Sequence, residues 1–246
     1  MPAPALSVVI PVRGRWLMTR DCLARLRRHT AARSEVLVVD GGSPAPMRRA
    51  LAALARSWPS LRVLRLERPL PFAAAVNRGL KAARGDVLVL LNNDVSVTAG
   101  WDAALARVLA QPGVGAAGPR TCRPGPGLDR DATACALAGA GRTRSVRVLY
   151  AHCLALRREA VSAVGLLDER LVWGEEDDDY CFRLRQGGWR LAEAEDCLVG
   201  HTGGASRGRW SPGRRRAHAR ANAAVLREKW VGEAARIRRD LKAVLA

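Results

Sequence analysis

The stretch "LVLLNNDVSV", residues 88–97, decides the fold that this sequence predicts. It begins as a run of Leu and Val, which is typical of a strand buried on both faces of a sheet. The run stops abruptly at Asn92, Asn93 and Asp94. Polar groups at the end of a buried element cost free energy unless they meet water, a metal ion or a ligand. The stretch therefore predicts a central strand with a ligand site at its end.

Earlier segments of the chain carry a related strand pattern. Residues 6–12, "LSVVIPV", and residues 35–43, "EVLVVDGGS", are short apolar runs that lead into turns, and residues 61–67 alternate like a more exposed strand. Segments of helical periodicity separate these runs, which indicates βαβ units. We therefore expect an α/β fold in which helices flank a mostly parallel central sheet.

The second half of the chain has a different pattern. Residues 119–145 are rich in Gly and Pro, which predicts an irregular segment or a weak hairpin. Residues 146–157 are expected to form a strand, and residues 179–189 are expected to form a helix. Because this half shows few strands of its own, we expect both halves to form one domain. Residues 207–246 are predicted to be a basic helical extension.

The charge of the chain indicates an anionic partner. The 246 residues carry a formal net charge of +18, which favours attraction to nucleotides, phospholipid headgroups or nucleic acid. A basic cluster occupies residues 207–220. A solvated tail and a surface for a membrane or a lipid-linked substrate both fit this cluster. Nucleic acid is not expected, because aromatic residues do not interleave with the basic ones.

The cysteines and the apolar segments indicate the compartment. The six cysteines are scattered, without a CxxC pair or zinc-like spacing, and a reduced cytoplasmic protein fits best. The N-terminus lacks the basic region of a signal peptide, and no stretch reaches the roughly 20 apolar residues of a membrane span. If the protein works at a membrane, we expect it to lie on the inner face rather than to cross it.

The ends of the predicted strands are the candidate ligand site, because open parallel sheets bind ligands there. Asp40 ends one strand before two glycines, so it is either a ligand for a base or ribose or a cap for the next turn. The chain has neither a GxGxxG after its first strand nor a P-loop, so a phosphate group would need a metal ion or basic side chains. Asp94, flanked by Asn92 and Asn93, offers hard oxygen ligands that suit Mg²⁺ or Mn²⁺ on a diphosphate.

Two further segments carry candidate chemistry. Five consecutive acids, residues 175–179, repel one another and need a cation, water or a helix N-terminus. They follow Trp173 and Gly174, and a carboxylate beside a Trp wall is a common setting for a general base. His201 follows a predicted strand and precedes a Gly pair. A single His in such a place is structural more often than it is a metal ligand.

Taken in order, these segments resemble the family 2 glycosyltransferases with the GT-A fold. The matching pieces are "LSVVIPVRGR", "EVLVVDGGS", "AAAVNRGLKAARGDVLVLLNNDV", "CLALRREAVSAVGLLDERLVWGEEDDDYCFRLRQGGWRL" and "HTGGAS". The resemblance implies a single nucleotide-sugar-binding domain over residues 1–206, with a nucleotide-binding half (1–113) and an acceptor or catalytic half (114–206). It also implies inverting transfer of a sugar from a UDP-, dTDP- or GDP-sugar.

The resemblance also implies roles for individual residues. The donor nucleotide is expected at Pro11, Val12, Arg13, Asp40, Asn77, Asn92 and Asn93. Asp94 and His201 are expected to hold Mg²⁺ or Mn²⁺, and Asn92 stands where the family usually has an acid. The base is expected in the pair Glu176–Asp177, with Asp177 preferred, although a register one residue earlier stays open. Trp173, Gly174 and His152 are expected to contact the acceptor, which is a saccharide, a lipid-linked glycan or a small molecule.

Two other functions remain open from the sequence. A sugar-nucleotide nucleotidyltransferase shares a similar sheet, but it needs a Gly-rich phosphate loop after the first strand, which residues 11–20 imitate only weakly. A non-catalytic anion-binding protein would use the basic C-terminal region as its working surface, and its binding would depend steeply on salt.

Overall fold

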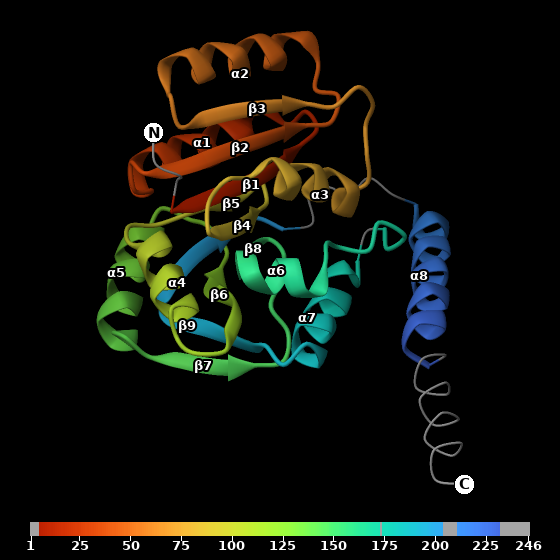
Figure 1. Cartoon of the computed structure of the whole chain (residues 1–246). Helices are drawn as coiled ribbons and strands as arrows, with labels where there is room; N and C mark the ends of the chain where they lie inside the picture. The colour runs from red at the N-terminus through yellow and green to blue at the C-terminus, as the bar shows by residue number, and fades with distance from the viewer. Residues whose placement is uncertain (1–4, 173, 204–210, 232–246) are drawn as a thin grey trace, which may run out of the picture.

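The computed structural model describes residues 5–172, 174–203 and 211–231. Within these residues, nine strands form one sheet with the order β3-β2-β1-β4-β8-β6-β9-β5, and β7 pairs with β9 (Figure 1). The first half supplies four parallel strands: β1 (Leu6–Val12), β2 (Ser34–Asp40), β3 (Leu61–Arg65) and β4 (Val87–Leu91). The strands predicted for this half are confirmed, including the central position of "LVLL" in β4.

The second half supplies most of the remaining strands. β6 (Val114–Cys122) and β9 (Arg190–His201) are parallel to each other, and β8 (Cys153–Arg157) is antiparallel to both β4 and β6. β6 and β9 therefore run in the direction of β4. Two short strands, β5 (Val95–Ser96) and β7 (Thr143–Val146), are antiparallel to β9. The prediction of a mostly parallel sheet is confirmed.

The expectation for residues 119–145 was wrong, and so was the expectation of few strands in the second half. This segment contains the end of β6, helix α5 (Leu128–Gly139) and β7. Its glycines are packing positions as well as turn residues, which the local sequence does not distinguish. A side chain at Gly139 would collide with the backbone of Glu195, so glycine allows α5 to lie directly on β9. The strand expected over 146–157 is also shorter, because the irregular segment 147–152 precedes β8.

Alternate residues of each central strand enter different cores, and this produces three layers. One core joins Val8 and Ile10 of β1 to α1 (Trp16–His29), α2 (Ala45–Ser57) and α4 (Trp101–Leu109). The other core joins Val9 to α3 (Phe72–Ala82), α6 (Arg158–Val164) and α7 (Glu176–Gln186). Such period-two burial on both faces explains why these strands read as continuous apolar runs.

Helix α3 packs unusually close to the sheet. A Cβ atom at Gly79 would collide with the side chain of Val9 and would lie 2.9 Å from Cγ2 of Val39. Real Cβ atoms need more room than this, so the sequence places glycine where the helix crosses β1 and β2. The close approach brings Asn77 of the same helix against the loop that follows α6.

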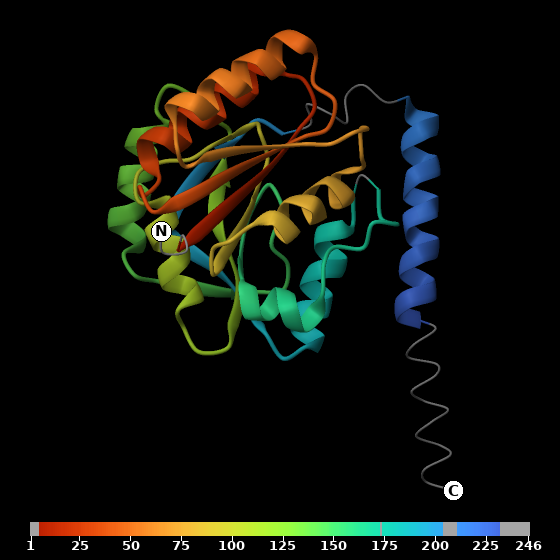
Figure 2. The same cartoon turned by 45° about the horizontal axis from the view of Figure 1, so that its top comes forward.

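The last described elements lie outside the sheet. Helix α8 (Pro212–Leu226) and the π-helical turn η2 (Arg227–Val231) stand beside the segment that leads into α7 (Figures 1 and 2). Residues 207–210 and 232–246 of the predicted extension lie outside the described residues. In the part of the chain that is described, no helix is long and apolar enough to cross a membrane.

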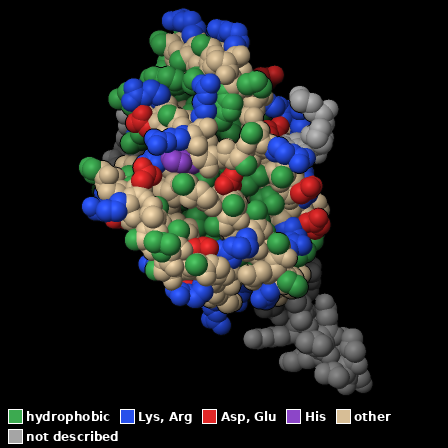
Figure 3. All heavy atoms as spheres, turned by 90° about the vertical axis from the view of Figure 1, so that its left-hand side faces the viewer, with side chains coloured by type: hydrophobic (Ala, Val, Ile, Leu, Met, Phe, Trp, Pro, Cys, Tyr) green, Lys and Arg blue, Asp and Glu red, His purple; other side chains and the backbone are tan. Residues whose placement is uncertain are grey.

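The molecular face in Figure 3 shows how charge is distributed away from α8. Lys and Arg side chains on this face are scattered and alternate with Asp and Glu. The positive charge of this face therefore does not form the continuous stripe that a nucleic-acid backbone would follow.

Candidate functional site

Several of the predicted site residues lie along one edge of the sheet. β1, β2 and β4 are parallel, so Arg13, Asp40 and Asn92 follow or end strands at their shared carboxyl edge. His201 ends β9 at the same edge, and His152 immediately precedes the antiparallel strand β8, whose first residue pairs with the end of β4. Sheet topology therefore places residues from five segments along one edge of the sheet.

Asp94 and His201 are in direct contact. Oδ1 of Asp94 lies 3.2 Å from Nε2 of His201. The backbone fixes both residues, because Val95 pairs with His201 between β5 and β9 and the N–H of Thr202 donates to the carbonyl of Asp94 at 3.2 Å. The structure thus brings together the two side chains expected to hold a metal ion.

His152 extends this pair into a stack of rings. Its ring lies 4.4 Å from that of His201, with 5° between the planes, and the ring of Tyr150 lies 6.2 Å from it at 21°. Nε2 of His152 is 2.9 Å from Oγ1 of Thr121, and its carbonyl accepts from the N–H of Asn92. His152, expected at the acceptor, is therefore also a direct neighbour of the Asp94–His201 pair.

The environment shifts the pKa of two of these groups. Burial of the Asp94 carboxyl opposes its ionisation, but the hydrogen bond and charge of His201 and backbone N–H groups outweigh burial and leave its pKa below the usual value. Burial, and then repulsion from His201, lower the pKa of His152 to about 4. An ionised Asp94 beside a neutral His152 is a suitable environment for a cation.

The Asp94–His201 pair fits a divalent metal ion. In the described part of the chain, no group of three or more His, Cys, Asp or Glu side chains is arranged to hold a metal. Mg²⁺ is commonly bound through one or two protein ligands, with substrate phosphates and waters completing its shell, and Mn²⁺ accepts both carboxylate and imidazole. Two protein ligands at an open sheet edge are therefore sufficient when a diphosphate supplies the others.

The acidic run forms the first turn of α7 instead of preceding the helix. Helix α7 begins at Glu176, so the run complements the positive end of its dipole. Glu176 is buried and accepts from the N–H of Gly174 at 2.6 Å. Burial, and then repulsion from Asp177 and Glu175, raise its pKa. Asp177 is only partly buried, and its Oδ2 lies 3.4 Å from the N–H of Ala151, next to His152.

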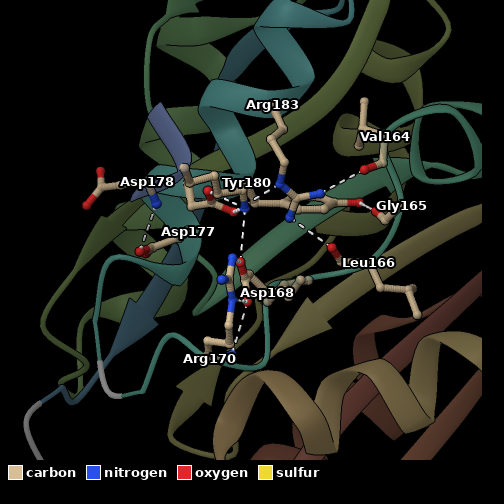
Figure 4. Close-up of polar contacts among 12 residues, drawn as sticks. Val164, Gly165, Leu166, Asp168, Arg170, Asp177, Asp178, Tyr180 and Arg183 are labelled. Atoms are coloured by element: carbon tan, nitrogen blue, oxygen red, sulfur yellow. Dashed lines mark hydrogen bonds and ion pairs between the residues drawn. The ribbon is translucent and has the colours of Figure 1, made fainter. Parts of the chain in front are cut away.

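Asp179 has a structural role through Arg183, whose side chain reaches toward Val164 and Leu166 in Figure 4. Arg183 donates to Oδ2 of Asp179 at 2.9 Å and to the carbonyls of Val164 and Leu166 at 2.8 Å each. The hydroxyl of Tyr180 donates to the carbonyl of Gly165. These contacts hold α7 against the loop after α6. Asp179, one acid of the run, therefore has a packing role.

The residues expected at the donor have differing surroundings. Asp40 is 1% exposed, and its oxygens accept from the N–H of Ser43 and from Arg65. The bond from Ser43 agrees with the alternative that Asp40 caps the turn after β2. Asn77 is also buried, and its amide bonds to the backbone of Leu167 and to Glu169. Protein groups therefore engage both side chains, and their donor roles stay predictions. Pro11 and Arg13 are more accessible, whereas Val12 is buried.

An open hollow lies beside His152. Its volume is about 530 Å³, and its walls include Thr121, Tyr150, His152 and the ion pair of Arg144 with Glu193. Gly174 lies in the segment before α7, and Trp173 lies outside the described residues. The hollow reaches the ring stack through His152, which connects it to the candidate metal pair.

Two residues of this region were not found from the sequence. Thr121 bonds to His152, and Asn222 of α8 bonds to the residues before α7. Thr121 lies in the segment that was expected to be irregular, and Asn222 is a single amide in a helix rich in Ala and Arg. Neither position carries a local signal, because its importance depends on contacts distant in sequence.

Comparison with known proteins gives a consistent picture. The model of the family described as glycosyl transferase family 2 matches residues 7–165. The pre-mycofactocin glycosyltransferase of Mycobacterium tuberculosis is 30% identical over 206 residues, which cover 80% of this chain and 42% of that protein. The chain spans less than half the length of the curated relatives that it matches.

Solved structures share the fold. A crystal structure of GalNAc-T7 with UDP, GalNAc and Mn²⁺ has a TM-score of 0.70 at 19% identity, covering 81% of this chain and 43% of that one. The mannosyltransferase PcManGT from Pyrobaculum calidifontis, in complex with GDP-Man and Mn²⁺, has a TM-score of 0.63 at 21% identity, covering 80% and 57%. At such identities the likeness establishes the fold.

Proposed function

The chain belongs to glycosyl transferase family 2, and from this membership we propose that it transfers a sugar from a nucleoside diphosphate donor to an acceptor hydroxyl, with inversion at the anomeric carbon. The proposal rests on one observation: the Asp94–His201 pair and Asp177 lie close to each other at one edge of the sheet. The Asp94–His201 pair touches His152, and Asp177 reaches the neighbouring Ala151. The proposed diphosphate site and the proposed base therefore contact the adjacent residues His152 and Ala151.

In the proposed reaction Asp177 is the general base. Its carboxylate accepts the proton of the acceptor hydroxyl while that oxygen forms a bond to the anomeric carbon. The bond from this carbon to the diphosphate oxygen breaks, and its electron pair leaves with the nucleoside diphosphate. Attack from the face opposite the leaving group inverts the configuration. Glu176 is less suited to this role, because it is buried and bonded to Gly174.

Asp94 and His201 are proposed to hold Mg²⁺ or Mn²⁺ at the donor diphosphate. When bound, this ion would neutralise negative charge on the diphosphate. Asn92, Asn93, Arg13, Asp40 and Asn77 are proposed to lie around the nucleotide. Mn²⁺ accompanies UDP in the structure of GalNAc-T7 and GDP-mannose in that of PcManGT, which supports a UDP- or GDP-sugar, and a dTDP-sugar remains in the proposal.

The acceptor is proposed to enter through the hollow beside Tyr150 and His152. An aromatic ring, a hydroxyl and a charged pair offer stacking and hydrogen bonds to a saccharide, either free or lipid-linked. We accordingly propose that residues 1–113 mainly bind the donor and residues 114–206 mainly bind the acceptor.

Contact with a membrane surface is a further part of the proposal. Arg215, Arg216 and Arg220 are exposed on α8, and clustered basic side chains attract anionic lipid headgroups. The six cysteines are unpaired, which favours the reducing cytoplasm. Co-sedimentation with vesicles of phosphatidylglycerol, compared with phosphatidylcholine vesicles, tests this contact: binding to neither kind would contradict it.

The proposed function is tested by a donor screen. Thermal midpoints are measured with UDP-, dTDP- and GDP-sugars, each with and without Mn²⁺, because a ligand that binds the folded state raises the midpoint. The stabilising donor is then incubated with saccharide acceptors, and the product linkage is determined by NMR. Release of a nucleoside diphosphate and an inverted linkage are expected. Release of pyrophosphate would indicate a nucleotidyltransferase, and no stabilisation by any donor would contradict the proposal.

A further inference from the structure

Asn222 joins the C-terminal helix to the residues that precede α7. It is 2% exposed, whereas its neighbours Ala221 and Ala223 are exposed. Its Oδ1 accepts from the N–H of Val172 at 3.0 Å. Its Nδ2 faces the carbonyls of Val172 at 3.1 Å and Gly174 at 2.9 Å, and also the carboxylate of Glu175. One buried amide therefore contacts three residues, Val172, Gly174 and Glu175, which we call the pre-helix residues.

The pre-helix residues set the start of α7. Glu175 has a φ of 62°, in the left-handed region that L-residues with side chains rarely adopt. Such a conformation persists when surrounding contacts determine it, and Asn222 contacts both this residue and the backbone of Gly174 just before it. The next two residues are Glu176 and Asp177. A change of backbone direction at Glu175 would therefore move both carboxylates.

A second set of contacts fixes η2 to α7 independently of Asn222. Nζ of Lys229 lies 2.8 and 3.0 Å from the two carboxylate oxygens of Asp179, and 3.2 Å from Oδ2 of Asp168. The ring of Trp230 packs edge-on against Phe182, with centroids 4.2 Å apart. Figure 4 shows Asp168 beside the helix that carries Arg183 and Tyr180. These contacts attach the C-terminal segment, whereas Asn222 reaches the residues that lead to the base.

We propose that Asn222 is a positioning residue of the transfer reaction. It holds the pre-helix residues so that the carboxylate of Asp177 faces the turn at Ala151 and His152. This inference rests on the proposed function, because it concerns the base of that reaction. Asn222, like Asp177 and His201, lies outside residues 7–165, the part of the chain that the family model matches, and through it helix α8 contributes to the proposed site.

Two substitutions separate positioning from simple attachment. Asn222→Ala removes every contact of the amide, whereas Lys229 and Trp230 still hold the segment. Asn222→Asp is nearly isosteric and keeps an acceptor for the N–H of Val172, but it lacks the N–H donors and places a carboxylate beside Glu175. Ala223→Ser, at the exposed neighbouring position of α8, is the matched control.

Three quantities are measured on each variant of the full chain: kcat and KM with the stabilising donor, the thermal midpoint, and amide hydrogen exchange of the peptide over residues 171–176. We expect kcat to fall about 10- to 100-fold in both Asn222 variants, because small misplacement of a catalytic group has effects of this size. Donor KM should stay within about twofold, and exchange should rise in the peptide. Ala223→Ser should match the wild type.

The outcomes distinguish the inference from the proposed function. An active wild-type enzyme whose Asn222 variants keep kcat within about twofold would overturn the positioning role. A loss of kcat with unchanged exchange would also overturn it, because the pre-helix residues would then be held without Asn222. A wild-type chain inactive with every donor would instead overturn the proposed function and, with it, the catalytic meaning of the contact. If Asn222→Ala fails to fold, Asn222→Asp supplies the same comparison.

Discussion

The carboxylate of Asp94 lies 3.2 Å from the imidazole of His201, although one residue follows β4 and the other ends β9. Strands β8 and β6 lie between β4 and β9 in the sheet order. The contact is made at the edge, where the chain beyond β4 crosses to form β5 and pairs with β9. Because the contact needs both side chains, we expect substitution of either Asp94 or His201 to disrupt the pair.

Asp94→Asn should weaken Mn²⁺-dependent donor binding by about 100-fold, because it removes the charge that an ion at a diphosphate requires. Calorimetric titration of UDP or GDP, with and without Mn²⁺, measures this loss. Asp86→Asn, an exposed position just before β4, is the control and should bind like the wild type. Equal affinities for Asp94→Asn and wild type would remove Asp94 from the metal site.

Asp177→Asn should lower kcat by about 10²–10⁴-fold, the range typical of a lost general base. The amide is nearly isosteric, so donor affinity should change little. Steady-state kinetics and donor titration together measure the two effects. Asp178→Asn is the matched control, because Asp178 is exposed in the same helical turn. A fully active Asp177→Asn enzyme would exclude Asp177 as the base, and Glu176→Gln would then be the next variant to measure.

Gly79→Ala should destabilise the fold by about 1–3 kcal/mol, the usual effect of overpacking a core. The added methyl group would meet the side chains of Val9 and Val39, which are both buried in the central strands. Chemical denaturation measures the free energy of unfolding. Gly213→Ala, a helical glycine with open space around it, should have no such effect. An unchanged stability of Gly79→Ala would show that α3 can move away from the sheet.

The sequence predicts the sheet edge well because each apolar run there ends at a chemically distinctive residue. β1, β2 and β4 are recognisable from local pattern, and the ordered motifs then place His201 and Asp177 near them. The sequence does not predict α5, because the role of Gly139 depends on the backbone of Glu195 across the fold. It does not predict Asn222 either, since an amide in an Ala-rich helix has no local pattern that indicates its partners.

A buried polar cluster at the opposite edge of the sheet gives a stability prediction that is independent of the site. Glu35 is 5% exposed and accepts from Oγ of Ser7 at 2.7 Å, from Arg62 and from the N–H of Arg84 at 3.0 Å. Burial opposes its ionisation, but these hydrogen bonds and the charge of Arg62 outweigh burial and lower its pKa. A carboxyl with a lowered pKa stabilises the fold above its unfolded pKa of about 4.3. The stabilisation is lost as the pH falls through the folded pKa.

Glu35→Gln should therefore reduce the free energy of unfolding at pH 7 by about 1–3 kcal/mol, because a buried hydrogen-bond network loses its charged acceptor. The difference from wild type should shrink as the pH falls below 4, where the wild-type carboxyl becomes protonated and resembles the amide. Urea denaturation at a series of pH values measures both curves. Glu67→Gln, at an exposed position, should follow the wild type at every pH. A difference between Glu35→Gln and wild type that is constant across the series would mean that the charge of Glu35 does not contribute, and that only the packing of its side chain does.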